Sequence, residues 1–187
     1  MEFERVVLKR RMIRAFKHRP VSAEKVRRII ELAQHYPSAG FSQGMAFIVV
    51  TDPDRIQRLR ELCRLRGDAP VLVVPCVSEK LYHDRYHEAD KLRPDGSEIE
   101  WTVPYWYFDA GCATLLILLS AVDQGLTAYL AGAFRPEPLR QELGIPQSFV
   151  PVGVISIGYP DYLSHVPSRS LDRGRRPQRE VVHYQHW

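Results

Sequence analysis

Arginines gather near both ends of the chain, at a spacing that suits an anion. Arg10, Arg11 and Arg14 fall within about one helical turn, and the first and last of them can point the same way. Like charges so close together repel one another unless an anion lies between them, and guanidinium groups bind phosphate through paired N–H donors. Near the other end, DRGRRP repeats the pattern with Arg173 and Arg175. Each cluster alone also fits a solvated basic turn, but together they favour two basic ends that meet on one anion.

The charge distribution supports an anion site rather than a general nucleic-acid surface. The net charge is +4, but residues 1–30 carry ten Lys or Arg against three Asp or Glu, and residues 161–187 carry five against three. The body between the two ends is therefore acidic. Because the basic excess is confined to the ends and the sequence carries no nucleic-acid-binding motif, we expect no nucleic-acid partner.

The loop HYPSAGFSQG, residues 35–44, is the second candidate site. Its small residues, Ser38, Ala39 and Gly40, allow a ligand to approach the backbone closely. Phe41, in the middle of the loop, has a side chain that can pack or stack but cannot form a hydrogen bond. We therefore expect this loop to lie against a ligand.

Several standard motifs of catalysis and ligand binding are missing. The chain has no GxGxxG or GxxxxGK[ST] phosphate cradle, no GxSxG nucleophile elbow and no HExxH zinc motif. His83 and His87 are four residues apart but have no obvious third partner, so we expect no metal. Cys63, Cys76 and Cys112 form no CxxC pair, and we expect them to be small buried hydrophobes.

Alternating helical and strand patterns would position these residues in a single domain, residues 1–187. Ser22 is a good N-cap for a helix, and Asp52-Pro53 opens another. Pro75 places its strand near an edge or a bulge. The patterns predict helices over 23–35, from 53 onward, over 106–124 and over 136–144, strands over 45–50, 71–77 and 149–160, a strand and loop over 126–134, and a strand-like EVVHYQHW at the end. This order is typical of an α+β layer structure.

The predicted helix over 106–124 is apolar almost all round. A helix with so little polar surface must be covered on every side, and a partner subunit could supply part of that cover. Its most apolar run, residues 110–122, is shorter than the roughly twenty residues of a membrane span. Because the N-terminus also lacks the apolar core of a signal peptide, we expect a cytoplasmic protein with no membrane partner.

Residues 79–106 read as a long excursion or lid that contains one short helix. The segment is polar and rich in aromatic side chains, which would either pack together or line a pocket for a flat ligand. Both alternatives are open for its aromatic residues, which are Tyr82, Tyr86, Trp101, Tyr105 and Trp106.

Four motifs, in order, resemble the nitroreductase-like flavoprotein family. RRMIRAF and PSAGFSQGM resemble its RRSxRxF and PSxxNxQPW segments, and DAGCATLLILLSAVDQGLTAYLAGAF resembles its central helix and GLG-type strand. LGIPQSFVPVGVISIGYP and RGRRPQREVVHYQHW resemble its LGIP…GYP and R-x-R-[KR]-P…EVVH segments, so that only 79–105 lies outside. The resemblance implies a three-layer α/β/α sandwich with a mostly antiparallel central sheet. It also implies a homodimer, with the long apolar helix at the interface and FMN bound between the subunits.

The resemblance implies an FMN-dependent NAD(P)H oxidoreductase that works by a ping-pong mechanism. Electrons would pass through flavin N5, near the backbone of Gly132 and with no catalytic side chain, to a small planar nitroaromatic or quinone acceptor. Phe41 and the lid aromatics would form the acceptor pocket. The implied cofactor-binding residues are Arg10, Arg11, Met12, Arg14, Arg173 and Arg175 at the phosphate and ribityl end, Pro37, Ser38, Ala39, Gly40, Phe41 and Gln43 along the ring, and Ala131 and Gly132 on its N5 side.

Four residues depart from the family pattern, and two of them are Gly44 and Met45, which stand where the family has Pro and Trp. Met12 stands where the family has Ser, which removes a hydroxyl, and Phe41 stands where it has Asn, which removes an amide. A Gly-Phe pair in this loop also resembles relatives that consume flavin to make dimethylbenzimidazole. That activity, a non-catalytic flavin-binding protein and the use of a deazaflavin in place of FMN are the alternatives.

Overall fold

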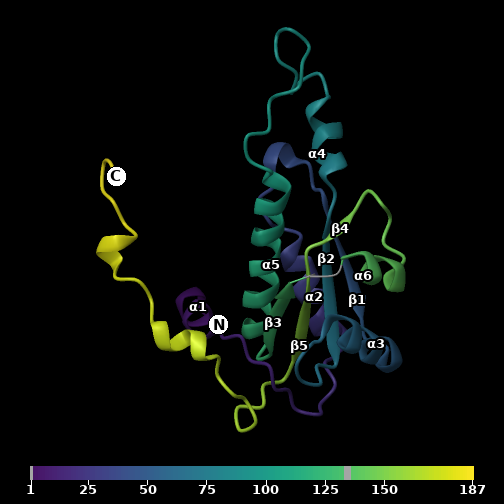
Figure 1. Cartoon of the computed structure of the whole chain (residues 1–187), viewed down its shortest axis with the longest axis vertical. Helices are drawn as coiled ribbons and strands as arrows, with labels where there is room; N and C mark the ends of the chain where they lie inside the picture. The colour runs from purple at the N-terminus through teal and green to yellow at the C-terminus, as the bar shows by residue number, and fades with distance from the viewer. Residues whose placement is uncertain (1, 133–135) are drawn as a thin grey trace.

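A five-stranded antiparallel sheet crosses the middle of the molecule (Figure 1). The computed structural model describes residues 2–132 and 136–187. The strands follow the order β1-β2-β5-β3, with β4 also beside β2, and all of these pairings are antiparallel. The strands are β1 (Met45–Val50), β2 (Val71–Val77), β3 (Thr127–Gly132), β4 (Val150–Pro151) and β5 (Gly153–Gly158). The predicted α+β class with a mostly antiparallel sheet is confirmed.

Two pairs of helices cover the two faces of this sheet. On one face, α2 (Ala23–Ala33) and α5 (Tyr105–Asp123) pack against strand residues that include Val71, Val73 and Ile155. On the other face, α3 (Pro53–Cys63) and α6 (Pro136–Leu143) pack against residues that include Leu72, Val74 and Val154. Successive strand residues point to opposite faces, so a strand that is apolar throughout serves both layers. The result is the predicted three-layer α/β/α sandwich.

Local capping sets the first residue of α2 and of α3, as the sequence predicts. Ser22 Oγ accepts a hydrogen bond from the Lys25 N–H at 3.4 Å, and Asp52 Oδ1 accepts one from the Arg55 N–H at 2.8 Å. Pro53 occupies the first position of α3, where its missing N–H has no partner to lose. These starts come from contacts within one turn, which explains why they are readable from the sequence.

Pro75 lies in an interior strand, because β2 has β1 on one side and β4 and β5 on the other. Val73 pairs with Ile155 in β5, and Cys76 pairs with Pro151 in β4. The chain opposite β2 therefore holds one extra residue over this stretch, which is the pattern of a β-bulge. Of the two predicted settings for Pro75, the structure has the bulge and not the edge.

The basic C-terminal arm, residues 161–187, runs away from the sheet (Figure 1). It contains the short 3-10 helices η2 (Arg169–Arg173) and η3 (Gln178–Glu180), and nearly all of its residues are exposed. The predicted strand in EVVHYQHW is wrong for this chain, because a strand needs a neighbour and none of the described strands pairs with the arm. Residues 133 and 134, at the end of the predicted strand and loop over 126–134, lie outside the described residues.

The two basic ends leave the body of the molecule side by side. An isolated antiparallel bridge joins Phe16 to Pro160, and the Asp161 N–H donates to the Ala15 carbonyl at 3.1 Å. The N-terminal segment that follows α1 (Phe3–Lys9) and the C-terminal arm therefore diverge from neighbouring points. The two arginine-bearing segments therefore start from adjacent points on the molecule.

Helix α5 is both the core helix and a partly uncovered one. Its length and composition would suffice to cross a membrane, but 56% of its apolar window is buried inside the molecule. The remaining surface includes Phe108, which is 60% exposed, and Leu115, which is 48% exposed. The single chain therefore leaves part of this helix without the cover that its composition calls for.

Gly67 makes room for the basic N-terminal segment. It has a left-handed φ of +70°, and a Cβ added there would lie against the Arg14 carbonyl oxygen, well inside normal contact. Gly96 has a similar φ of +81° but no atom within 4 Å of the same position. The two glycines thus separate backbone strain from a steric clash.

We expect Gly67→Ala to lower the free energy of unfolding by about 2–4 kcal/mol, and Gly96→Ala to lower it by about 1 kcal/mol. Both changes add left-handed strain, but only the first adds a clash with backbone. Urea unfolding followed by circular dichroism measures both values. Equal losses would show that Gly67 is not needed for close approach.

Candidate functional site

The loop between α2 and β1 has an unusual backbone. It contains the 3-10 helix η1 (Ala39–Phe41), and φ is +59° at Gly40, +57° at Phe41 and +52° at Gln43. This left-handed region suits glycine but costs about 1–2 kcal/mol for a residue with a Cβ, and it persists only where the surroundings impose it. The Phe41 side chain is nevertheless 73% exposed. The loop thus holds strain while presenting an aromatic ring to the outside.

Hydrogen bonds within the loop close it on itself. The Gln43 N–H donates to Ser38 Oγ at 2.8 Å, and the Phe41 N–H donates to the Ser38 carbonyl at 2.9 Å. The Ser42 N–H donates to the Ala39 carbonyl at 3.1 Å. These bonds give the loop its shape, but they do not attach it to the rest of the molecule.

A buried carboxylate on α5 attaches the loop to the core. Asp109 is 3% exposed, and its Oδ2 accepts the Ala39 N–H at 2.9 Å and the Tyr82 hydroxyl at 2.8 Å. Burial and the hydrogen bond to this carboxylate raise the pKa of Tyr82, so its hydroxyl stays a donor at neutral pH. One oxygen atom therefore joins the loop, α5 and the helix that carries Tyr82.

Helix α4 (Glu79–Tyr86) holds the loop from another direction. Arg85 Nε donates to the Gly40 carbonyl at 3.0 Å, and two further bonds at 2.7 Å tie the guanidinium to Asp90. The hydrogen bond from Arg85 lowers the pKa of Asp90 to about 2. A Cβ at Gly40 would lie 2.5 Å from the ring of Tyr86. The predicted excursion thus contains the expected short helix, and that helix contacts the loop.

The excursion aromatics pack mainly against one another. The Trp101 ring lies 4.6 Å from the Tyr86 ring and 5.7 Å from the Trp106 ring, between centroids. Tyr82 and Trp106 are buried in this chain, as the packing alternative predicts, and the assignment of the excursion aromatics to an acceptor pocket stays a prediction. Tyr86 and Trp101 are half-buried, and Tyr105 is exposed.

A hydrogen-bonded pair closes the excursion. Glu98 Oε1 lies 2.8 Å from His83 Nδ1 and also accepts the indole N–H of Trp101. Burial alone lowers the pKa of His83, but the hydrogen bond and charge of Glu98 outweigh it and place that pKa above its ordinary value. The bonds from Trp101 and His83 likewise outweigh burial and hold the pKa of Glu98 below its ordinary value.

The five arginines predicted at the two chain ends, here called the end arginines, lie on two segments that diverge from the bridge between Phe16 and Pro160. Their side chains are exposed or half-buried, and none forms an ion pair within the described ranges. The Arg14 guanidinium lies over the ring of Tyr129, 5.5 Å from the ring centroid. The backbone N–H of Arg14 donates to His165 Nδ1 at 3.5 Å. The end arginines are Arg10, Arg11, Arg14, Arg173 and Arg175.

Met12 and the end of β3 complete the predicted cofactor residues. Met12 is half-buried and packs against the apolar residues on both faces of the sheet. Its side chain therefore contributes to the core and supplies no hydroxyl donor. Ala131 and Gly132 pair with Val154 and Gly153, and Gly132 is exposed at the end of the edge strand. Their backbone is accessible at this edge.

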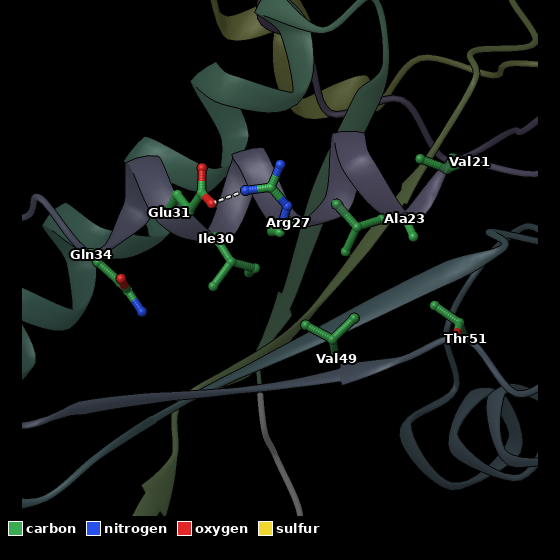
Figure 2. A pocket seen from close by; sticks show the side chains of 9 residues that line it. Val21, Ala23, Arg27, Ile30, Glu31, Gln34, Val49 and Thr51 are labelled. Atoms are coloured by element: carbon green, nitrogen blue, oxygen red, sulfur yellow. Dashed lines mark hydrogen bonds and ion pairs between the residues drawn. The ribbon is translucent and has the colours of Figure 1, made fainter.

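A groove runs along edge strand β1, beside α2 (Figure 2). One part has a volume of about 580 Å³, with Ile30 and Val49 facing each other across it. A second hollow of about 360 Å³ includes Gln34, Tyr36 and Gln43, so this side of the sheet is open as far as the foot of the loop. None of the end arginines lines either hollow.

Sequence reasoning missed Asp109 and Arg85, which hold the loop. A signal for the first was present, because Asp109 is a lone acid in the first turns of an otherwise apolar helix. Nothing in the sequence pattern distinguishes Arg85 from the other charged residues of the excursion.

Comparisons with known proteins agree with this fold. A sequence model of the nitroreductase family matches residues 7–159. An Archaeoglobus fulgidus protein, provisionally named NADH dehydrogenase/NAD(P)H nitroreductase, is 31% identical over 83% of this chain and 84% of its own. The Bacillus subtilis FMN reductase [NAD(P)H] is 29% identical over 92% of this chain and 69% of its own. The crystal structure of a nitroreductase family protein from Clostridium difficile 630 covers 100% of both chains, with a TM-score of 0.74 and 25% identity.

The pair of His83 and Glu98 predicts a pH dependence. Its contribution to stability is present above the ordinary glutamate pKa of about 4.3 and below the ordinary histidine pKa of about 6.5. It is lost as the pH rises through the raised pKa of His83 or falls through the lowered pKa of Glu98.

We expect Glu98→Gln to lower the pKa of His83, because the negative charge that stabilises the protonated imidazole is removed. NMR titration of the His83 ring measures this change. Glu88→Gln is the control, since Glu88 pairs with Arg85 and not with His83. A His83 pKa that is the same in the Glu98→Gln variant and the parent would contradict the assigned pairing.

Proposed function

The chain belongs to the nitroreductase family, and on that premise we propose that it is an FMN-dependent NAD(P)H oxidoreductase that reduces a small planar acceptor. The names of its relatives, which include an FMN reductase [NAD(P)H], support an oxidoreductase with a nicotinamide donor. The observation that carries the proposal is the strained, braced backbone of the loop 37–43, whose sequence resembles the family's PSxxNxQPW segment. A cytoplasmic location stays a prediction.

The end arginines suit the phosphate of FMN. No carboxylate pairs with them among the described residues, so their charge is available to a dianion. Arg55 and some other surface arginines also lack a carboxylate partner among the described residues. The lack of such a partner is therefore necessary for phosphate binding, but it does not distinguish the end arginines from other arginines. The stronger support is topological, because the bridge between Phe16 and Pro160 starts both basic segments from one place.

The loop suits the flavin ring. Its small residues leave the backbone accessible, and the exposed Phe41 offers an apolar surface where the family has an amide. Bound FMN would supply the redox chemistry, taking a hydride from the nicotinamide donor and passing electrons to the acceptor. This chain's residues would position the ring and keep its surroundings apolar. Phe41 would then bear on which acceptor can stack there.

A homodimer is part of the proposal. Nitroreductase family members are typically dimers, and this chain leaves apolar side chains uncovered on several elements. A second copy would cover them and would bring one copy's basic ends toward the other's loop. The uncovered side chains are Phe3 and Leu8 on α1, Phe108 and Leu115 on α5, and Leu163 and Val166 on the arm.

The purified protein tests the function directly. We expect a yellow protein with an FMN absorption spectrum, which oxidises NADH or NADPH when menadione or nitrofurazone is supplied. Bound flavin without turnover would contradict the reductase and favour a flavin-binding protein. Loss of flavin absorbance with formation of dimethylbenzimidazole would favour the flavin-consuming alternative. A deazaflavin spectrum would show that the cofactor is a deazaflavin and not FMN.

The phosphate assignment predicts the effect of removing two end arginines. We expect the double variant Arg10→Ala/Arg175→Ala to lose FMN while it keeps its folded, dimeric state, because the phosphate loses charge from both ends. Flavin content per subunit and size-exclusion chromatography measure the two properties. Arg27→Ala/Arg55→Ala removes the same charge from α2 and α3 and serves as the control. Flavin retained at the parental level in the first variant would refute the assignment.

A further inference from the structure

The strained loop needs support from outside itself. Phe41 and Gln43 both have left-handed backbones, and the bonds within the loop involve only its own atoms. Such a conformation relaxes unless neighbouring groups hold it. Within the described ranges, two side chains from outside residues 38–43 bond to the backbone of this segment: Asp109 on α5 and Arg85 on α4.

We propose that Asp109 is a positioning residue, acting with Tyr82 and Arg85 to hold the loop 38–43 in the shape that receives the flavin ring. The assignment rests on the proposed function as far as the flavin is concerned. The brace itself is a property of the chain alone. It gives α4 a role other than that of a lid, since this helix supports the loop from behind.

Asp109 is suited to this role by its burial and by its partners. A carboxylate that is 3% exposed needs donors to compensate its charge, and it receives one from the loop and one from α4 at Oδ2. Hydrogen bonds to an ionised acceptor are shorter and stronger than those between neutral groups. Releasing Ala39 would leave the buried charge with one donor fewer, so the loop and the helix are held together.

Arg85 fixes the next residue of the loop. Its Nε bonds to the Gly40 carbonyl, and Asp90 orients the rest of the guanidinium through two bonds. The ring of Tyr86 fills the space where a side chain at Gly40 would lie. Two consecutive residues of the loop, Ala39 through its N–H and Gly40 through its carbonyl, are thus held from two elements.

The chain offers a matched control for the hydroxyl of Tyr82. Tyr36 is also buried, and its hydroxyl lies near Ser38 and the Met45 backbone but donates no hydrogen bond to Asp109. Tyr36→Phe and Tyr82→Phe therefore remove the same atom near the same loop. Only the second change takes a donor from Asp109.

Hydrogen–deuterium exchange on the purified protein, before and after FMN is added, tests the proposal. We expect exchange in the peptide that spans the loop to be at least tenfold faster in Asp109→Ala, and FMN to bind at least tenfold more weakly by fluorescence titration. Tyr82→Phe and Arg85→Gln should each give part of this effect, and Tyr36→Phe, which leaves both donors to Asp109 in place, should give a smaller effect than Tyr82→Phe. Asp109→Asn keeps an acceptor oxygen and should fall between Asp109→Ala and the parent.

Three outcomes would overturn the proposal. These are parental exchange in the loop, equal effects of the two tyrosine variants, and faster exchange spread over the whole sheet, which would indicate a general loss of stability. If Asp109→Ala does not fold, Tyr82→Phe and Arg85→Gln carry the same comparison. If the parent protein binds no FMN, the proposed function fails, while loop exchange in the variants still decides whether the brace exists.

Discussion

The buried carboxylate of Asp109 is the constraint on which the candidate site depends. An ionised group inside an apolar core is unfavourable unless donors surround it, and here the donors come from segments far apart in the sequence. Compensation of one charge therefore orders the loop and α4 together against α5. The two bonds to Oδ2 fix the Ala39 end of the loop and Tyr82 of α4.

The excursion, residues 79–106, supports the loop in this arrangement. Its aromatic side chains form a small packed cluster at the end of the sheet, with Tyr82 and Trp106 inside it. That cluster keeps α4 in place, and α4 in turn keeps Arg85 beside the loop. The aromatic cluster therefore supports α4, and α4 supports the loop through Arg85. A substitution in the excursion should for this reason alter the conformation of the loop.

The two chain ends show the opposite situation, because little within the chain compensates them. The end arginines have no acidic partners in residues 2–132 and 136–187, and apolar residues of α1, α5 and the arm are exposed. Both features are unfavourable in an isolated chain, and both would be relieved by an anionic ligand and a second copy. In the proposed function, the body of the protein supplies a preformed loop while the ends complete the site on assembly.

The sequence by itself determined the elements whose causes are local. Ser22 and Asp52 cap their helices through neighbours within one turn, and continuous apolar runs specify strands of a sheet that is covered on both faces. The positions that could hold a ligand were also readable, because residue types and spacing identify them. Only the tertiary structure decided which loop atoms meet Asp109, which lies 70 residues from Ala39, and that Pro75 faces a bulge inside the sheet. It also decided that the C-terminal segment forms no strand in this chain. Each of these depends on a partner brought near by folding, and no local pattern specifies such a partner.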